Sequence, residues 1–212
     1  MPDTATRAGA GESAARADDT RDRLIEAAAE VFSEKGYDGA GVHEIARRAG
    51  VTTGAIYNRF SGKAALLLEA IEAHTFSEFD ALFASRRYEG RPTDILAIVG
   101  GHLVDDEWDQ GRGLVLEAFV AARRDPELAA LLRARLAEEA GRVSELVDDA
   151  KPAGLVDPDL DTESIATFCH SVALGFLLLG AVRAELPDQK PWEQLIERVI
   201  EGVADRSGRA EG

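Results

Sequence analysis

Residues 42–59 read VHEIARRAGVTTGAIYNR, and this stretch decides how the chain begins to fold. Two short helices that cross steeply need a small residue where they touch, and Ala46 supplies one. Gly50, four positions later, tolerates the positive φ of a tight turn. Ile56, ten positions after Ala46, can bury its side chain against the first helix. This joint spacing predicts a helix-turn-helix, although a structural corner without a DNA-binding role would use the same residue types.

Apolar residues elsewhere in the chain recur at spacings of three and four, as in amphipathic helices. Sustained strand-type alternation is missing from the sequence. Gly36 is suited to end the first helix because it can adopt the left-handed conformation without steric cost. We therefore expect an all-α fold of about nine helices. Their expected ranges are 21–36, 42–49, 53–60, 62–83, 92–106, 110–124, 126–151, 162–185 and 191–205.

These helices divide into two predicted domains with short tails. A three-helix DNA-binding domain that contains the helix-turn-helix is expected at 20–65. A larger helical domain is expected at 66–206. Segments 1–19 and 207–212 are predicted to be disordered tails, because the first is too weakly apolar to fold.

The net charge of −15 is unevenly distributed along the 212 residues. Within 42–63, three arginines and one lysine face a single glutamate, which gives this segment a charge of +3. An acidic body with a small basic tip suits DNA binding through the tip alone, since the body weakens non-specific adhesion.

Composition also predicts a location. The first 19 residues lack the apolar core of a secretory signal, and the longest apolar run, 172–182, is too short to span a bilayer. The single cysteine, Cys169, excludes an internal disulfide. We therefore expect a cytoplasmic protein without a membrane partner.

The sequence contains only incomplete versions of known catalytic and metal-binding motifs. His43-Glu44 begins like a zinc-protease motif, but the second histidine is replaced by Arg47. The acidic stretch 157–161 resembles a calcium loop but lacks its glycine, so it predicts a helix-entry turn. Glycine-rich phosphate loops and nucleophile elbows are missing too. We expect neither enzymatic activity nor a cofactor.

Residues 20–72 resemble the TetR family of bacterial transcriptional regulators. The first helix of that family is matched by Arg21–Ala28, Val31-Phe32 and Lys35-Gly36-Tyr37, its helix-turn-helix by Val42–Ala46 and Ala49–Tyr57, and the start of its fourth helix by Phe60–Leu66. Beyond this region only helix number and length agree. The sequence departs from the family at Ala40, Gly41 and Gly62, where polar or hydroxyl residues are usual.

The resemblance implies that 53–60 is the recognition helix, which would enter the major groove of DNA. Arg59 could pair with guanine and Asn58 with adenine, and Ala55 could meet a thymine methyl group. Gly54 would let the backbone approach DNA closely. The remaining DNA-binding candidates, for base edges or phosphates, are Arg21, Thr52, Thr53, Tyr57 and Lys63, with Thr52 also capping the recognition helix.

Some of these assignments have alternatives. Tyr57 could instead pack on the first helix. Arg47 and Arg48 fit a solvated helix face at least as well as a DNA contact.

The resemblance also implies that the domain at 66–206 binds a ligand and forms a homodimer through the helices at 162–185 and 191–205. The interface candidates are Leu174, Gly175, Leu178, Leu195, Val199 and Val203, for which an intramolecular core is an equal alternative. An effector pocket would be lined by aromatic and a few polar side chains. Its candidates are Phe79, Phe83, His102, Trp108, Phe119 and Phe168, although core packing is the favoured role for each of them.

We therefore expect a bacterial repressor that a small apolar or amphipathic ligand releases from a palindromic, double-stranded operator. When bound to DNA it would be associated with the nucleoid. The acidic run 105–109 could attract a cationic ligand or could be an exposed loop. One alternative is a helical small-molecule carrier or enzyme. The other is a regulator that acts as an activator or is controlled by a partner protein.

Overall fold

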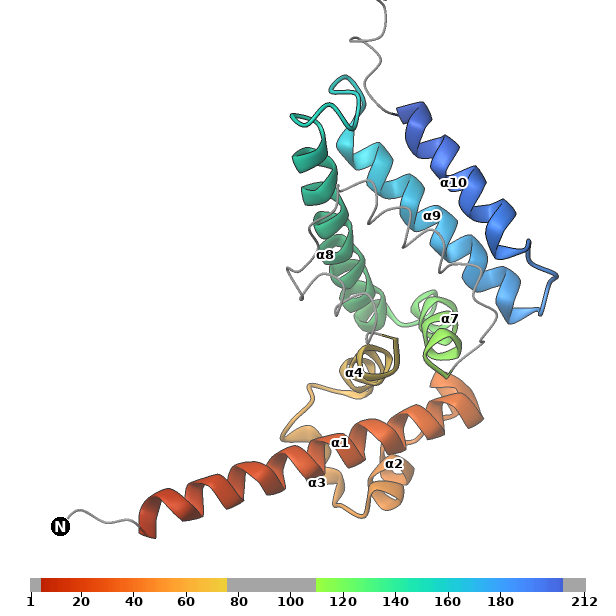
Figure 1. The fold of residues 1–212 in the computed structure, drawn as a ribbon. Helices are drawn as coiled ribbons and strands as arrows, with labels where there is room; N and C mark the ends of the chain where they lie inside the picture. The colour runs from red at the N-terminus through yellow and green to blue at the C-terminus, as the bar shows by residue number, and fades with distance from the viewer. Residues whose placement is uncertain (1–4, 76–109, 204–212) are drawn as a thin grey trace, which may run out of the picture. The chain divides into compact units, whose positions relative to one another are not determined.

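The computed structural model describes residues 5–75 and 110–203, with side chains from Asp19 onward. All regular elements in these ranges are helices, so the all-α fold is confirmed (Figure 1). Part of the expected helix at 62–83 and all of that at 92–106 lie outside the described residues. The described helices are α1 (Ala5–Gly39), α2 (Val42–Ala49), α3 (Thr53–Tyr57), α4 (Lys63–Thr75), α7 (Gln110–Ala122), α8 (Pro126–Ala150), α9 (Thr162–Ala181) and α10 (Gln189–Val203).

The described helices belong to two compact units. The first combines α1 to α4 with α7 and the beginning of α8, and the second contains the rest of α8 with α9 and α10. The expected boundary at residue 65 cuts through the first unit, because α7 packs on both α1 and α4. Gly111 of α7 lies so close to α4 that a Cβ atom would stand 2.5 Å from the carbonyl oxygen of His74.

Helix α1 begins at Ala5, inside the segment whose composition predicts a disordered tail. The segment is rich in alanine, the best helix former, and it continues a helix that packing already holds. At the other end Gly36 interrupts the helix with φ 69° and ψ 171°, at the position where the sequence predicts its end. A Cβ atom there would also lie 3.0 Å from Oε1 of Glu117 on α7.

The helix-turn-helix is built as its spacing predicts. Ile45, Ala46 and Ile56 are buried where α2 meets α3. Gly50 turns the chain between the two helices with φ 69° and ψ 33°, and its N–H donates to the carbonyl groups of Ala46 and Arg47. Phe60 is buried as well. This small core makes the outer surface of α2 and α3 a fixed platform.

In the second unit, α8 and α9 are joined around the loop at 151–161. Val147, Ala150 and Val156 form a buried core there. Asp161 caps α9 by accepting a hydrogen bond of 2.7 Å from the N–H of Ser164. The acidic stretch 157–161 is therefore a helix-entry turn, as predicted.

Helices α9 and α10 lie side by side, with Phe176 and Trp192 in edge-to-face contact at 4.7 Å between ring centroids (Figure 1). By length and hydropathy alone, α9 could cross a membrane, and little of it is buried within the chain. However, its first half carries polar side chains, and its apolar second half shares the Phe176 contact with α10.

Candidate DNA interface

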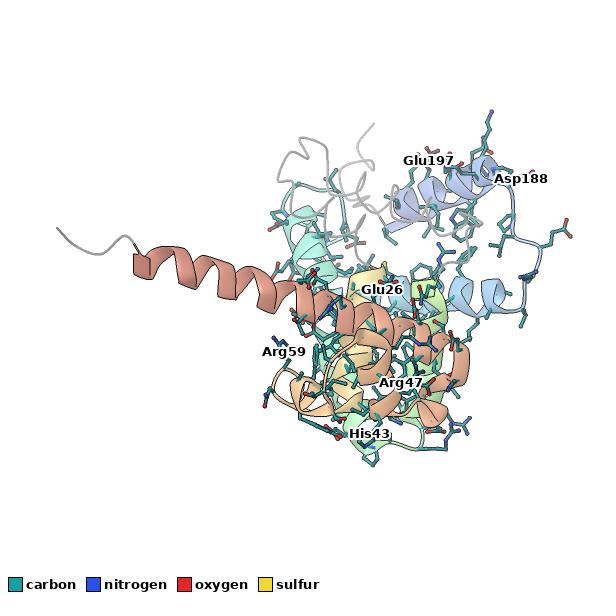
Figure 2. The ribbon with its side chains drawn as sticks, turned by 90° about the horizontal axis from the view of Figure 1, so that it is seen from below. Glu26, His43, Arg47, Arg59, Asp188 and Glu197 are labelled. Atoms are coloured by element: carbon teal, nitrogen blue, oxygen red, sulfur yellow. The ribbon has the colours of Figure 1, made fainter. Side chains whose placement is uncertain are left out.

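One side of α3 is buried and the other is presented to solvent. Ile56 anchors the helix, and the Thr52 hydroxyl caps it by accepting a hydrogen bond of 3.3 Å from the N–H of Ala55. Tyr57 is 59% exposed, so more than half of its side-chain surface faces solvent. Asn58 and Arg59 follow the helix and are exposed too. Arg59 is labelled in Figure 2, which shows the molecule from below.

Gly54 lies on this surface without an internal reason to be glycine. A Cβ atom added there would meet only the hydroxyl oxygen of Thr52, at 3.8 Å, which is an ordinary van der Waals distance. Its φ lies outside the left-handed region, since the positive-φ glycines of the described residues are Gly36, Gly50 and Gly154. Neither packing nor backbone conformation therefore requires a glycine at this position.

His43 is a surface residue that the sequence reasoning did not assign to the interface. It lies in the first turn of α2 and is exposed (Figure 2). Its Nδ1 atom is 3.0 Å from the hydroxyl oxygen of Thr53, the first residue of α3. The sequence did offer one signal for this contact. His43 lies ten residues before Thr53, and a predicted turn between two helices separates them.

The two arginines of α2 have different environments. Arg48 donates to the Glu34 carboxylate at 2.7 and 2.8 Å and to Glu30 at 3.3 Å, both on α1. These bonds raise the pKa of Arg48, and Arg48 in turn lowers the pKa of Glu34. Arg48 is thus neither a solvated side chain nor a free DNA ligand. Arg47, by contrast, has a side chain that is 74% exposed, at the edge of contact with Glu44 (4.0 Å).

Lys63 is held inside the first unit. Its Nζ donates to the carbonyl oxygens of Tyr37 (2.8 Å) and Ala40 (3.4 Å) and lies 4.3 Å from the centroid of the Tyr37 ring. The sequence-based role of Lys63 was a phosphate contact. In the structure, Lys63 connects the start of α4 to the end of α1. A phosphate contact by Lys63 stays a prediction.

Tyr37 connects this anchor to α7 and α8. The buried ring stacks on Phe32, the backbone N–H donates to Glu117 at 2.6 Å, and the hydroxyl donates to Asp125 at 2.8 Å. Burial, and then the hydrogen bond to Asp125, raise the pKa of Tyr37. The backbone N–H of Leu128, followed by the Tyr37 hydroxyl, lowers the pKa of Asp125. The joint between α1, α4 and the α7–α8 turn is therefore polar and hydrogen-bonded.

Arg21, the other predicted phosphate ligand outside the helix-turn-helix, forms an ion pair with Glu69 of α4. The Arg21 side chain is about half exposed. Exposed ion pairs are weak, typically about 0–1 kcal/mol, so DNA phosphates could compete for this guanidinium group.

The predicted effector pocket falls largely outside the described residues. Phe79, Phe83, His102 and Trp108 lie in the segment 76–109. Phe119 is half-buried on α7 in the first unit, and Phe168 is exposed on α9 in the second. The pocket therefore stays a prediction.

The predicted dimer helices present apolar side chains to solvent. Leu178 is 57% exposed on α9, and Leu195 and Val199 are exposed on α10. Leu174, Gly175 and Val203 are half-buried. Of the described helices, α10 contains no buried residue at all.

Two family models match the chain. One, described as bacterial regulatory proteins of the tetR family, matches residues 24–70, and the other, described as the C-terminal part of BetI-type transcriptional repressors, matches residues 94–205. The HTH-type transcriptional regulator UidR of Escherichia coli K12 is 27% identical over 199 residues, which are 89% of this chain and 94% of UidR. The HTH-type transcriptional regulator SrpR of Pseudomonas putida is 50% identical over 64 residues, 30% of this chain and 28% of SrpR.

Solved structures share the fold. A TetR-family regulator from Rhodococcus sp. has a TM-score of 0.73 at 18% identity and covers 89% of this chain and 100% of its own. Salmonella enterica GusR has a TM-score of 0.69 at 23% identity, with coverages of 87% and 95%. The similarity thus extends over both units, well beyond the helix-turn-helix.

Proposed function

This chain belongs to the TetR family and is a DNA-binding transcriptional regulator, and we propose that it is a dimeric repressor that a small molecule releases from a palindromic operator. The observation that carries the proposal is the surface of α3. Its inner side is fixed by Ile56, and its outer side combines exposed polar side chains with Gly54, a glycine that folding does not require.

In the proposed complex α3 lies in the major groove. Arg59 pairs with guanine, Asn58 with adenine, and Ala55 meets a thymine methyl group. Thr53 faces a base edge, while Thr52 and Tyr57 bind phosphates and fix the register. The absence of a Cβ at Gly54 lets the helix backbone come close to the DNA. Arg21 and Lys63 contact phosphates only by giving up part of their present bonds.

The proposed dimer forms through α9 and α10. The exposed leucine and valine side chains on these helices support this interface, because large apolar patches on soluble proteins usually mark interaction sites. Two copies would present their recognition helices to half-sites about one DNA turn, ~35 Å, apart. Binding to a chromosomal operator places the protein in the bacterial cytoplasm, at the nucleoid when bound.

The proposed switch is a ligand-dependent change in the distance between the two recognition helices. A small apolar or amphipathic ligand in the second domain would favour a state that cannot span both half-sites. Release by ligand also requires that operator DNA weaken ligand binding by the same factor. The repressor role is supported by the BetI-type repressor model that matches residues 94–205.

The test begins with selection of genomic fragments on the purified protein. We expect a palindrome to be enriched, and a reporter gene placed behind it to be expressed less when the protein is present. Arg59→Ala should lose the enrichment, whereas Arg133→Ala, which removes an exposed arginine from α8, should keep it. A reporter that is activated would refute the repressor role. Failure to enrich any palindrome would refute the operator proposal.

A further inference from the structure

The contact between His43 and Thr53 connects the two helices of the DNA-binding motif at their outer surface. His43 belongs to α2 and Thr53 to α3, and their Nδ1 and Oγ1 atoms are 3.0 Å apart. His43 is exposed, and Thr53 is half-exposed. A DNA molecule that receives α3 in its major groove therefore approaches both residues.

The chemistry of this pair depends on whether Nδ1 of the imidazole carries a proton, as it does in the imidazolium and in one of the two neutral tautomers. A neutral imidazole has one donor and one acceptor nitrogen, whereas an imidazolium has two donors. When Nδ1 is an acceptor, the Thr53 hydroxyl must use its hydrogen for His43 and can only accept a hydrogen bond from DNA. When Nδ1 carries a proton, it donates to the hydroxyl oxygen, and the hydroxyl hydrogen becomes free for an acceptor on a base or phosphate.

The carboxylate nearest to His43 in the sequence is already paired with other cations, so a DNA phosphate is the anion that His43 would meet in the complex. On α2, the adjacent Glu44 carboxylate is bound by Lys35 of α1, which lowers the pKa of Glu44, and it also lies 3.7 Å from Arg48. Arg47, one turn further along α2, is exposed. From α3, the ionisable side chain is that of Tyr57, which is exposed. Operator phosphates would supply the negative potential that favours the imidazolium.

We infer that His43 is a specificity-determining residue: in the free protein the neutral ring carries its proton on Nε2 and Nδ1 accepts from Thr53, and protonation of Nδ1 on operator binding frees the Thr53 hydroxyl to donate to the operator. The inference rests on the proposed placement of Thr53 against DNA. Histidine side chains ordinarily change charge between pH 5 and 8, and this sets the pH range of the test.

The test measures the affinity of the full-length protein for its selected palindrome from pH 8 to pH 6 at constant salt. Wild-type affinity should rise by roughly threefold or more as the pH falls, and by at most about a hundredfold for each half-site, because each half-site takes up at most one proton over these two pH units. His43→Asn keeps an amide group that can bond to Thr53 but cannot titrate. Its affinity should therefore vary little over this range, and far-ultraviolet circular dichroism should confirm that it is folded.

The matched control is His170→Asn, because His170 lies on α9, where its Nδ1 is 3.0 Å from the carbonyl oxygen of Ala166. This variant should keep the wild-type pH dependence. Selection of randomised half-sites at both pH values should show a changed base preference for the wild type and an unchanged one for His43→Asn.

A pH dependence that survives in His43→Asn, or a wild-type affinity that does not change with pH, would overturn the inference. If that pH-independent binding were still lost in Arg59→Ala, the proposed operator function would stand and only the role of His43 would fail. Absence of operator binding at every pH would refute both.

Discussion

Replacing Gly54 by alanine should separate DNA binding from folding. The new methyl group would meet only the Thr52 hydroxyl oxygen, at 3.8 Å, so it should neither clash nor strain the backbone. Alanine in place of glycine within a helix stabilises it by about 0.5–1 kcal/mol. The effect should be at the lower end of that range, since Gly54 lies near the start of a short helix. For a chain of this size we expect the melting temperature to rise by roughly 1–3 °C.

The same methyl group should weaken operator binding. It would lie between the backbone of α3 and the DNA, where the proposed complex is most closely packed. Overpacking of a tight contact costs about 1–3 kcal/mol, which corresponds to a loss of about 5- to 150-fold in affinity at each half-site. Fluorescence anisotropy with labelled operator measures the affinity, and differential scanning calorimetry measures the stability.

Gly141→Ala provides the matched control, because Gly141 is an exposed glycine of α8 whose added Cβ would meet no atom within 4 Å. This variant should gain a similar stability and bind the operator like the wild type. A Gly54→Ala protein with wild-type affinity would refute the proposed close approach. A Gly54→Ala protein that is clearly less stable would show that the glycine serves folding instead.

Three further substitutions test the packing of the first unit and the proposed dimer interface. Tyr37→Phe removes the hydrogen bond to Asp125 and should lower the free energy of unfolding by about 1–3 kcal/mol in urea titrations, without loss of secondary structure; an unchanged midpoint would show that the joint does not stabilise the fold. Gly111→Ala places a Cβ 2.5 Å from the His74 carbonyl oxygen, and it should destabilise the protein by about 1–3 kcal/mol or more in the same titration. Leu178→Glu should convert the proposed dimer into a monomer in analytical ultracentrifugation and weaken operator binding at least about 100-fold, because the two half-sites are no longer bound together; a Leu178→Glu dimer would refute the proposed interface.

The helix-turn-helix could be predicted from the sequence because its determinants are local. Ala46, Gly50 and Ile56 lie within one short stretch, and each has a single structural role that its residue type reveals. The same holds for Thr52 as a cap and for Gly36 as a helix end. Short-range sterics and hydrogen bonding therefore suffice to place the recognition surface.

Side-chain partners could not be predicted, because they come from distant parts of the chain. Lys63 is held by Tyr37 and Arg48 by Glu34, and neither pairing follows from spacing along the sequence. In the sequence, a lysine or arginine that will be exposed cannot be distinguished from one that will be held by a distant partner. The contact between His43 and Thr53 spans only ten residues, and it was missed because an exposed histidine in the first turn of a helix does not reveal its partner by residue type.

The equilibrium affinity of the purified protein for its selected palindrome, compared with a palindrome scrambled in both half-sites, tests the central claim most directly. At physiological salt, we expect the intact palindrome to bind about a thousandfold or more tightly, and its affinity to fall steeply as salt is raised. Arg59→Ala should remove most of the difference between the two sequences. Equal affinities for the intact and scrambled palindromes would contradict the assignment of α3 as a base-reading helix.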